Sequence, residues 1–319
     1  MRALVVDPSG SISLKHVPDP SYNGECLVRV LQAGICGTDL QILQGYAEFA
    51  GIPGHEFVGV VEAVSSDDDA SWMGRRVVGE INVGCGRCSW CAAGEKEHCT
   101  GRSVVGIRDR GGAFAEFVSL PAANLHEVPA AISDDAAVFV EPAAAACRIL
   151  EQIAVGGSDR VAVLGDGRMG LLVAQVLRTA APDVTVLGRH HHKLDVARAL
   201  GLDARHADLL RDDDRRFDLV VDVTGRAEGL GRALELVRAR GTVVLKSTFH
   251  GEAPLVSWPI VVDEVTLVGS RCGPFRRAIE LLASGAVRVD PLISAVVPLE
   301  DYADAFAQAR TAIKVMLRM

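Results

Sequence analysis

Four cysteines in one short segment constrain this chain more than any other feature of its sequence. Cys85, Cys88, Cys91 and Cys99 are separated by two, two and seven residues. Thiolates at this spacing can surround one tetrahedral Zn²⁺, and four sulfurs leave no open position for water or a substrate. Two disulfides or four unpaired thiols are the alternatives, but disulfide frameworks are typical of short secreted chains. We therefore predict a closed, structural zinc site in a lobe at about residues 84–100.

Length and composition favour two domains of α/β type. A chain of 319 residues exceeds one typical core, and 49% hydrophobic residues with 32 glycines suggest an Ala/Val/Leu-rich α/β protein. The formal net charge of −8, without a basic stripe, argues against nucleic acid or an anionic membrane as a partner. No apolar stretch resembles a signal peptide or a membrane span, so we expect a cytoplasmic protein.

The first 130 or so residues have the pattern of a β-rich domain. Short alternating or β-branched runs stand between Gly, Pro and Asp turn signals, at 27–34, 57–64, 75–83 and 113–120. The acidic segment 65–70 is interpreted as a solvated turn. After residue 273 a helix at 275–283 precedes a β-like segment at 291–300, a final helix and the strand-like 314–318. We expect residues 1–142 and 273–319 to form this domain.

Strands and helices alternate between residues 143 and 272. This alternation predicts βαβ units on a parallel sheet, and hence a Rossmann dinucleotide-binding domain. The predicted strands are 160–164, 184–187, 217–223, 242–246 and 265–269, and the predicted helices are 169–180, 194–200 and 227–238.

A glycine turn follows the first of these strands and opens a helix. Gly165, Gly167 and Gly170 form the pattern G-x-G-x-x-G. The first glycine allows the tight turn, the second lets a pyrophosphate approach the backbone, and the third lets helix and strand pack closely. Arg168 and Met169 begin the helix, whose N-terminal N–H groups can bind phosphate. Flanked by strand and helix, the turn predicts a dinucleotide site.

The end of the second predicted strand indicates which dinucleotide binds. An NAD site normally carries Asp or Glu there, to accept from the ribose 2′-OH. This chain has Gly188, which opens space, and Arg189, whose guanidinium suits a 2′-phosphate. We therefore favour NADP(H) over NAD(H). His190, the first of three consecutive histidines, is placed near the adenosine, although a solvent-facing loop is the alternative.

Three further residues could bind a second metal ion. Cys36 follows one β-run, His55 begins the next, and Glu141 precedes the dinucleotide domain. A catalytic zinc site has three protein ligands of mixed type and one open position, and this set supplies one sulfur, one nitrogen and one oxygen. Spacing alone does not distinguish such a set from ordinary core or surface residues.

The order of these motifs resembles that of the zinc-containing medium-chain dehydrogenases/reductases. CGTD, GHE-FVG-VVEAV, the four-cysteine loop, GGAFAEFV, VEPAAAA and the glycine turn follow one another as in that family, over essentially the whole chain. The resemblance implies a GroES-like catalytic domain beside the Rossmann domain, two zinc ions per chain, and homodimers or homotetramers. VEP is similar to the sorbitol, glucose and threonine dehydrogenase branches, in which Glu141 would be the third ligand of the catalytic zinc.

The resemblance also implies roles for residues around this zinc. Asp39 would orient His55, Glu56 would be an adjacent carboxylate able to exchange onto zinc, and Thr38 would contact the substrate oxygen and pass on its proton. The chain departs from many relatives at Gln41, where a histidine ends their proton relay, because glutamine does not titrate near neutral pH. The chain is also shorter than most relatives, mainly in loops.

The function predicted from these features is hydride transfer between NADP(H) and a secondary alcohol, polyol or sugar, or the matching carbonyl. Zinc would act as a Lewis acid on the substrate oxygen. Two alternatives remain: a zinc-independent NADPH reductase of enones or quinones on the same fold, and a non-catalytic protein that binds zinc and a dinucleotide.

Overall fold

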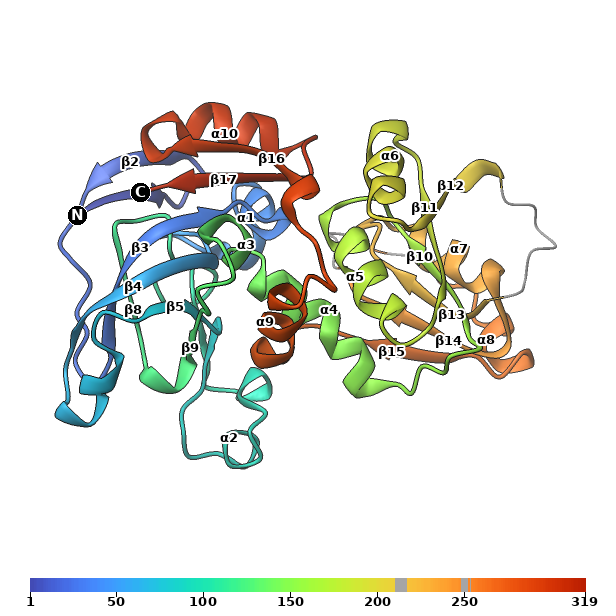
Figure 1. Ribbon diagram of the computed structural model, residues 1–319, viewed down its shortest axis with the longest axis horizontal. Helices are drawn as coiled ribbons and strands as arrows, with labels where there is room; N and C mark the ends of the chain where they lie inside the picture. Colours follow the sequence, from blue (N-terminus) through green and yellow to red (C-terminus); the bar gives the residue numbers. More distant parts are fainter. Residues whose placement is uncertain (210–216, 248–251, 253) are drawn as a thin grey trace. The chain divides into compact units, whose positions relative to one another are not determined.

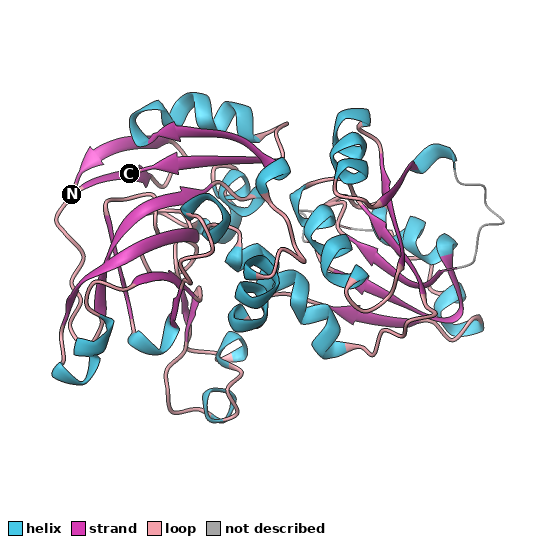
Figure 2. Cartoon of the chain, viewed as in Figure 1, coloured by secondary structure: helices cyan, strands magenta, loops and turns pink. Residues whose placement is uncertain are grey.

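The computed structural model describes residues 1–209, 217–247, 252 and 254–319. The chain forms two compact units, Met1–Glu141 with Ile293–Met319, and Pro142–Leu292. Figures 1 and 2 show a separate sheet in each unit. Among the described residues, no helix is both long enough and apolar enough to cross a membrane.

The first unit is built on a mostly antiparallel sheet of seven strands (Figure 1). The strand order is β16-β17-β3-β4-β5-β9, with β8 also paired to β3. Two further strand pairs, β1 with β2 and β6 with β7, lie outside it. The strands are β1 (Arg2–Val6), β2 (Ile12–His16), β3 (Cys26–Gly34), β4 (Glu56–Val64), β5 (Arg76–Gly79), β6 (Asn82–Val83), β7 (Ser103–Val104), β8 (Phe117–Leu120), β9 (Leu125–Glu127), β16 (Ile293–Pro298) and β17 (Lys314–Arg318).

Short helices connect the strands of the first unit. The β-runs predicted from the sequence correspond to β3, β4, β5 with β6, and β8. Residues 65–70, expected as a turn, lead into a short 3₁₀ helix at Asp67–Trp72, whose start is capped by Ser66. The helices are α1 (Gly37–Ile42), α2 (Ser89–Ala92), α3 (Asp134–Ala137) and α10 (Tyr302–Ala309).

The second unit is a six-stranded parallel sheet with the order β12-β11-β10-β13-β14-β15. Its central strands are apolar and almost wholly buried, as expected when helices cover a parallel sheet. Helices α5 and α6 pack on β10, β11 and β12, and α7 packs on β13 and β14 (Figure 1). The strands are β10 (Arg160–Leu164), β11 (Asp183–Gly188), β12 (Asp203–His206), β13 (Phe217–Asp222), β14 (Val237–Leu245) and β15 (Thr266–Gly269).

The helices of the second unit follow the predicted alternation. They are α4 (Val140–Gln152), which begins at the end of the first unit, α5 (Arg168–Arg178), α6 (His191–Ala199), α7 (Gly229–Leu236), α8 (Trp258–Val262) and α9 (Phe275–Ala283). The helix predicted at 227–238 ends earlier, at Leu236, because Val237 already pairs with Phe217 in the sheet.

The segment 273–292 differs from the sequence-based assignment, because it belongs to the second unit rather than to the first. Two contacts explain this. A Cβ atom on Gly273 would lie 2.0 Å from the carbonyl oxygen of Ala144, so this glycine packs directly against α4. The buried Gln175 side chain on α5 donates to the carbonyl of Arg288 and accepts from its N–H, at 3.1 and 2.8 Å.

Candidate functional site

The four cysteines of the predicted zinc lobe come together as expected. Their four sulfur atoms, from Cys85, Cys88, Cys91 and Cys99, all lie within 4.8 Å of one another. All four residues are free thiols and form no disulfide. A Cβ atom on Gly84 would lie 2.7 Å from the Cys91 sulfur, so the glycine leaves room for the cluster. Figure 1 shows α2 within the loop that carries it.

The geometry of this lobe fits a closed zinc site. A Zn–S distance of about 2.3 Å places tetrahedral sulfurs about 3.8 Å apart. The sulfurs of Cys88 and Cys91 are 3.6 Å apart. Backbone N–H groups of Arg87 and Cys88 lower the pKa of Cys85 to about 6, whereas burial raises the pKa of Cys91 to about 11, so in the metal-free cluster Cys85 is the thiol that ionises most readily.

A second group of potential metal ligands forms where β3 ends and β4 begins. Ligand atoms of Cys36, His55 and Glu56 lie within 4.8 Å of one another. Antiparallel pairing of Gly34 with Glu56 brings the two chain segments together, although they are distant in sequence. The group offers one sulfur, one nitrogen and one oxygen, the mixed set expected for a catalytic zinc.

Asp39 positions two members of this group. Its buried carboxylate accepts from the backbone N–H of Cys36 at 2.7 Å, and its other oxygen lies 3.3 Å from His55 Nδ1. Burial alone would lower the pKa of His55, but Asp39 and the Cys36 thiol raise it well above its ordinary value. The Asp39 carboxylate that raises this pKa would also favour a divalent cation bound to His55. The Thr38 hydroxyl lies beside the group, 3.8 Å from the Cys36 sulfur.

The carboxylate that clusters with Cys36 and His55 is that of Glu56. The sequence-based set contained Glu141, with Glu56 as a neighbour that could exchange. The clustered set contains Glu56, and Glu141 is outside it. Glu56 starts a strand paired to the segment before Cys36, whereas Glu141 lies in the first turn of α4, and its role as third ligand stays a prediction.

Lys314 is a residue of this site that the sequence interpretation missed. It lies on the last strand, β17, and its side chain is fully buried. Its ammonium group contacts the Glu56 carboxylate, lies 3.4 Å from the carbonyl oxygen of Ile35, and sits over the Phe139 ring at 5.7 Å from the ring centre. A side chain on Gly34 would collide with this ammonium group. A fully buried cation therefore faces the carboxylate of the candidate metal group.

The glycine turn has the steric properties that a dinucleotide needs. Gly165 has a φ of 125°, which favours glycine, and a Cβ on Gly170 would lie 1.9 Å from the Gly165 carbonyl oxygen. A Cβ on Gly167 would meet no protein atom within 4 Å, so this position is open toward a ligand. Gly167 also precedes the first residue of α5 without a side-chain cap, leaving N–H groups available to phosphate.

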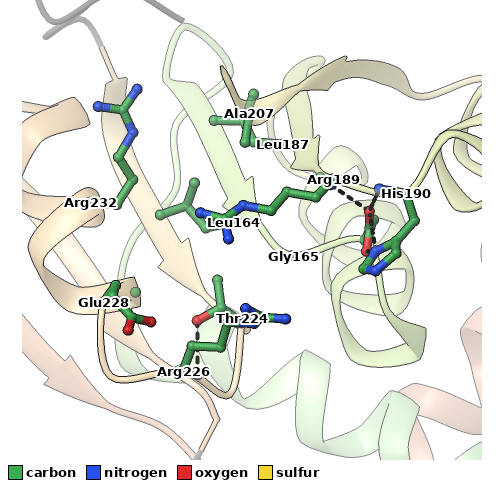
Figure 3. Close-up of a pocket in the computed structure, with 13 residues that line it drawn as sticks. Leu164, Gly165, Leu187, Arg189, His190, Ala207, Thr224, Arg226, Glu228 and Arg232 are labelled. Carbon is green, nitrogen blue, oxygen red and sulfur yellow. Dashed lines mark hydrogen bonds and ion pairs between the residues drawn. The ribbon is translucent and has the colours of Figure 1, made fainter. Parts of the chain in front are cut away.

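A pocket lies at the carboxyl ends of the parallel strands in the second unit (Figure 3). Of the predicted cofactor residues, Gly165, Gly188, Arg189 and His190 line it. The sequence interpretation did not single out Asp166 or the residues after β13, and the other predicted residues lie beside the pocket on the turn and at the start of α5. The complete lining is Leu164, Gly165, Asp166, Leu187, Gly188, Arg189, His190, Ala207, Thr224, Arg226, Glu228, Gly229 and Arg232.

The strand-end position differs from the sequence interpretation. We expected Gly188 to open space, but the Asp166 side chain fills it: a Cβ on Gly188 would lie 2.3 Å from an Asp166 carboxylate oxygen. Figure 3 shows the Arg189 side chain extending across the pocket toward Leu164 and away from His190. The pocket thus presents a guanidinium group to a ligand.

Comparison with known proteins establishes the family. Residues 22–130 match the alcohol dehydrogenase GroES-like domain, and residues 134–319 match the glucose dehydrogenase C-terminus. The chain belongs to the zinc-containing medium-chain dehydrogenases/reductases. The resemblance seen in the sequence and the predicted fold class, a GroES-like domain plus a Rossmann domain, are both confirmed.

Three relatives illustrate the similarity. D-arabinitol dehydrogenase 1 of Uromyces fabae is 30% identical over 100% of this chain and 97% of its own. An alcohol dehydrogenase (rspB) of Escherichia coli CFT073, complexed with NADH, is 28% identical with a TM-score of 0.91, covering 100% of this chain and 99% of its own. A zinc-binding dehydrogenase of Sinorhizobium meliloti 1021, bound to NADP, is 29% identical with a TM-score of 0.90 and the same coverage.

Proposed function

We propose that this protein is a zinc-dependent dehydrogenase that transfers a hydride between NADP(H) and a secondary alcohol, polyol or sugar, or the matching carbonyl compound. The observation that carries the proposal is the group of Cys36, His55 and Glu56, with Asp39 buried behind it. The named relatives include a polyol dehydrogenase, which supports oxidoreduction of an alcohol or polyol.

The chain contains candidate ligands for two zinc ions and a candidate acceptor for the alcohol proton. Cys36, His55 and Glu56 would hold the catalytic zinc, and the four-cysteine lobe a second, structural zinc. When bound, the catalytic zinc supplies a Lewis acid that lowers the pKa of an alcohol. The Thr38 hydroxyl, beside Cys36, would accept the alcohol proton. Gln41 cannot carry this proton further by titration, so the relay would end at water or at a ribose hydroxyl.

The arginines of the pocket support NADP(H) as the cofactor. Arg189, Arg226 and Arg232 line the pocket together with the acidic residues Asp166 and Glu228. A guanidinium group can form bidentate, charge-assisted hydrogen bonds with a phosphate, and NADP differs from NAD by such a group. The rival role for Arg189 is stacking on adenine, which would serve both cofactors equally.

The test combines metal content with activity. We expect two zinc ions per chain and turnover with a panel of secondary alcohols, polyols and sugars, faster with NADP⁺ than with NAD⁺. His55→Ala should abolish turnover and keep NADPH binding, because the pocket residues all lie in the other unit. His16→Ala, at an exposed histidine of the same unit, is the matched control. Full activity of His55→Ala would refute the zinc mechanism, and one zinc per chain with enone reduction would support the reductase.

A further inference from the structure

Asp166, the second residue of the glycine turn, has an unusual set of partners. Its side chain is 7% exposed. One carboxylate oxygen accepts from the backbone N–H groups of Arg189 and His190, at 2.8 and 2.7 Å. The other lies 2.9 Å from His190 Nδ1. A buried carboxylate in the turn after β10 thus fixes the backbone that follows β11.

The same side chain decides what position 188 can hold. A Cβ on Gly188 would lie 2.3 Å from the Asp166 carboxylate oxygen and 2.4 Å from its Cβ. Gly188 is not among the glycines with positive φ, so its backbone would accept other residues. The exclusion is therefore steric, and the three atoms nearest to the added Cβ all belong to Asp166. An acidic residue at the strand end, the usual acceptor of the ribose 2′-OH, has no room here.

The charge of Asp166 is compensated within the protein. Burial would raise the pKa of this carboxyl, but the hydrogen bonds from the backbone and ring of His190 and from the Arg189 N–H hold it below its ordinary value. The carboxylate is therefore ionised and already paired. Beyond it, the Arg189 side chain extends into the pocket (Figure 3). Arg226 and Arg232 also line this pocket, and Arg232 is paired with Glu235.

We propose, on the basis of the dinucleotide function proposed above, that Asp166 is a positioning residue that sets the cofactor preference. It occupies the place of a strand-end acid, and it holds the Arg189 backbone so that the guanidinium is directed to the 2′-phosphate of NADP. Selectivity in this chain therefore depends on a residue of the glycine turn and not on the strand-end residue.

The competing role for Asp166 is direct acceptance of the ribose 2′-OH. Its oxygen near His190 retains acceptor capacity, and Asp166 lines the pocket. The two roles predict opposite effects of Asp166→Ala. A positioning residue loses NADPH affinity on truncation, whereas a direct acceptor loses NADH affinity and leaves NADPH binding unchanged or tighter.

Dissociation constants of NADPH and NADH, measured by fluorescence titration of the whole protein, distinguish these roles without any turnover. We expect Asp166→Ala to weaken NADPH about tenfold, the worth of one charge-assisted hydrogen bond, and NADH less than about threefold. Asp166→Asn keeps an oxygen for the two N–H groups and should stay within about threefold of wild type for both. Asp195→Ala, which removes an exposed acid paired with Arg198, is the matched control.

A pair of variants tests the steric part of the proposal. Gly188→Asp alone should lose both cofactors, because its side chain collides with Asp166. Combining Asp166→Gly with Gly188→Asp should restore binding and turn the preference toward NADH. Wild-type protein that binds neither dinucleotide would refute the proposed function itself. Two other results would overturn only the role of Asp166, provided that the wild-type protein binds NADPH. One is a ratio of NADPH affinity to NADH affinity that is the same in Asp166→Ala as in the wild type, and the other is unchanged cofactor binding by Gly188→Asp.

Discussion

The buried ion pair between Lys314 and Glu56 leads to a quantitative prediction about stability. Both side chains are essentially inaccessible to solvent, at 0% and 1% exposure. Lys314→Met leaves the Glu56 carboxylate without its cation in a region of low dielectric constant. Removing one partner of a buried pair costs about 3–5 kcal/mol. Replacing both partners by apolar residues of similar volume costs much less, so the loss comes from the carboxylate that is left buried without a cation. We therefore expect the free energy of unfolding of the first unit to fall by about that amount.

A half-buried pair in the same unit provides the control. Lys96 and Glu80 lie 2.7 Å apart with side chains 23% and 26% exposed, and Glu80 also contacts His126, so Lys96→Met leaves a carboxylate that keeps a partner and should cost clearly less than Lys314→Met. Urea unfolding monitored by circular dichroism gives both values. The double variant Lys314→Met with Glu56→Gln should recover most of the loss, because no uncompensated charge remains.

Zinc provides a second measurement on the same variants. A divalent cation held by Glu56 would compensate the carboxylate after Lys314 is removed, so the destabilisation should be smaller in zinc-loaded protein than after chelation. The reasoning is refuted if Lys314→Met and Lys96→Met shift the unfolding midpoint equally. It is also refuted if zinc makes no difference to the effect of Lys314→Met.

Three further predictions concern the metal sites and assembly. Cys85→Ser should release one zinc per chain and lower the melting temperature, whereas Cys147→Ser, at a buried thiol outside both metal groups, should keep two zinc ions. Glu56→Gln should lower the occupancy of the second zinc more than Glu141→Gln does, and metal analysis showing the reverse order would restore the sequence-based ligand set. Strand β15 ends the parallel sheet and exposes Leu267, so we expect two copies to pair there; Leu267→Lys should shift the mass measured by light scattering toward the monomer, and a monomeric wild type would contradict this.

Features set by local sequence were predicted well. Strand β10 and helix α9 have the bounds expected from the sequence, because buried β-branched runs and a clear helical period determine them. The four cysteines cluster as expected, since all of them lie within one loop. Cys36 and His55 also lie close together. Their spacing in the sequence did not predict this, but the resemblance to the family did.

Features set by contacts between distant segments were not predictable from local patterns. Lys314 lies 258 residues from Glu56 in the sequence, and a lysine in a terminal strand carries no sign of its burial. The segment 273–292 was assigned by the style of its sequence to the wrong unit, because the contacts of Gly273 and Gln175 with the parallel-sheet unit cannot be read from a periodic pattern. Asp166 was overlooked because its partners become neighbours only through the parallel pairing of β10 with β11.

Both units place a buried carboxylate at the point where the proposed chemistry needs a defined charge. Glu56 is compensated by Lys314, and Asp166 by His190 and two backbone N–H groups. A carboxylate held by such partners has a fixed position and stays ionised despite its burial, whereas a solvated one has no fixed position. A substitution at either carboxylate therefore also changes its partner. For this reason the strand-end exchange of glycine for aspartate that the family rule suggests should fail at Gly188 unless Asp166 is changed with it.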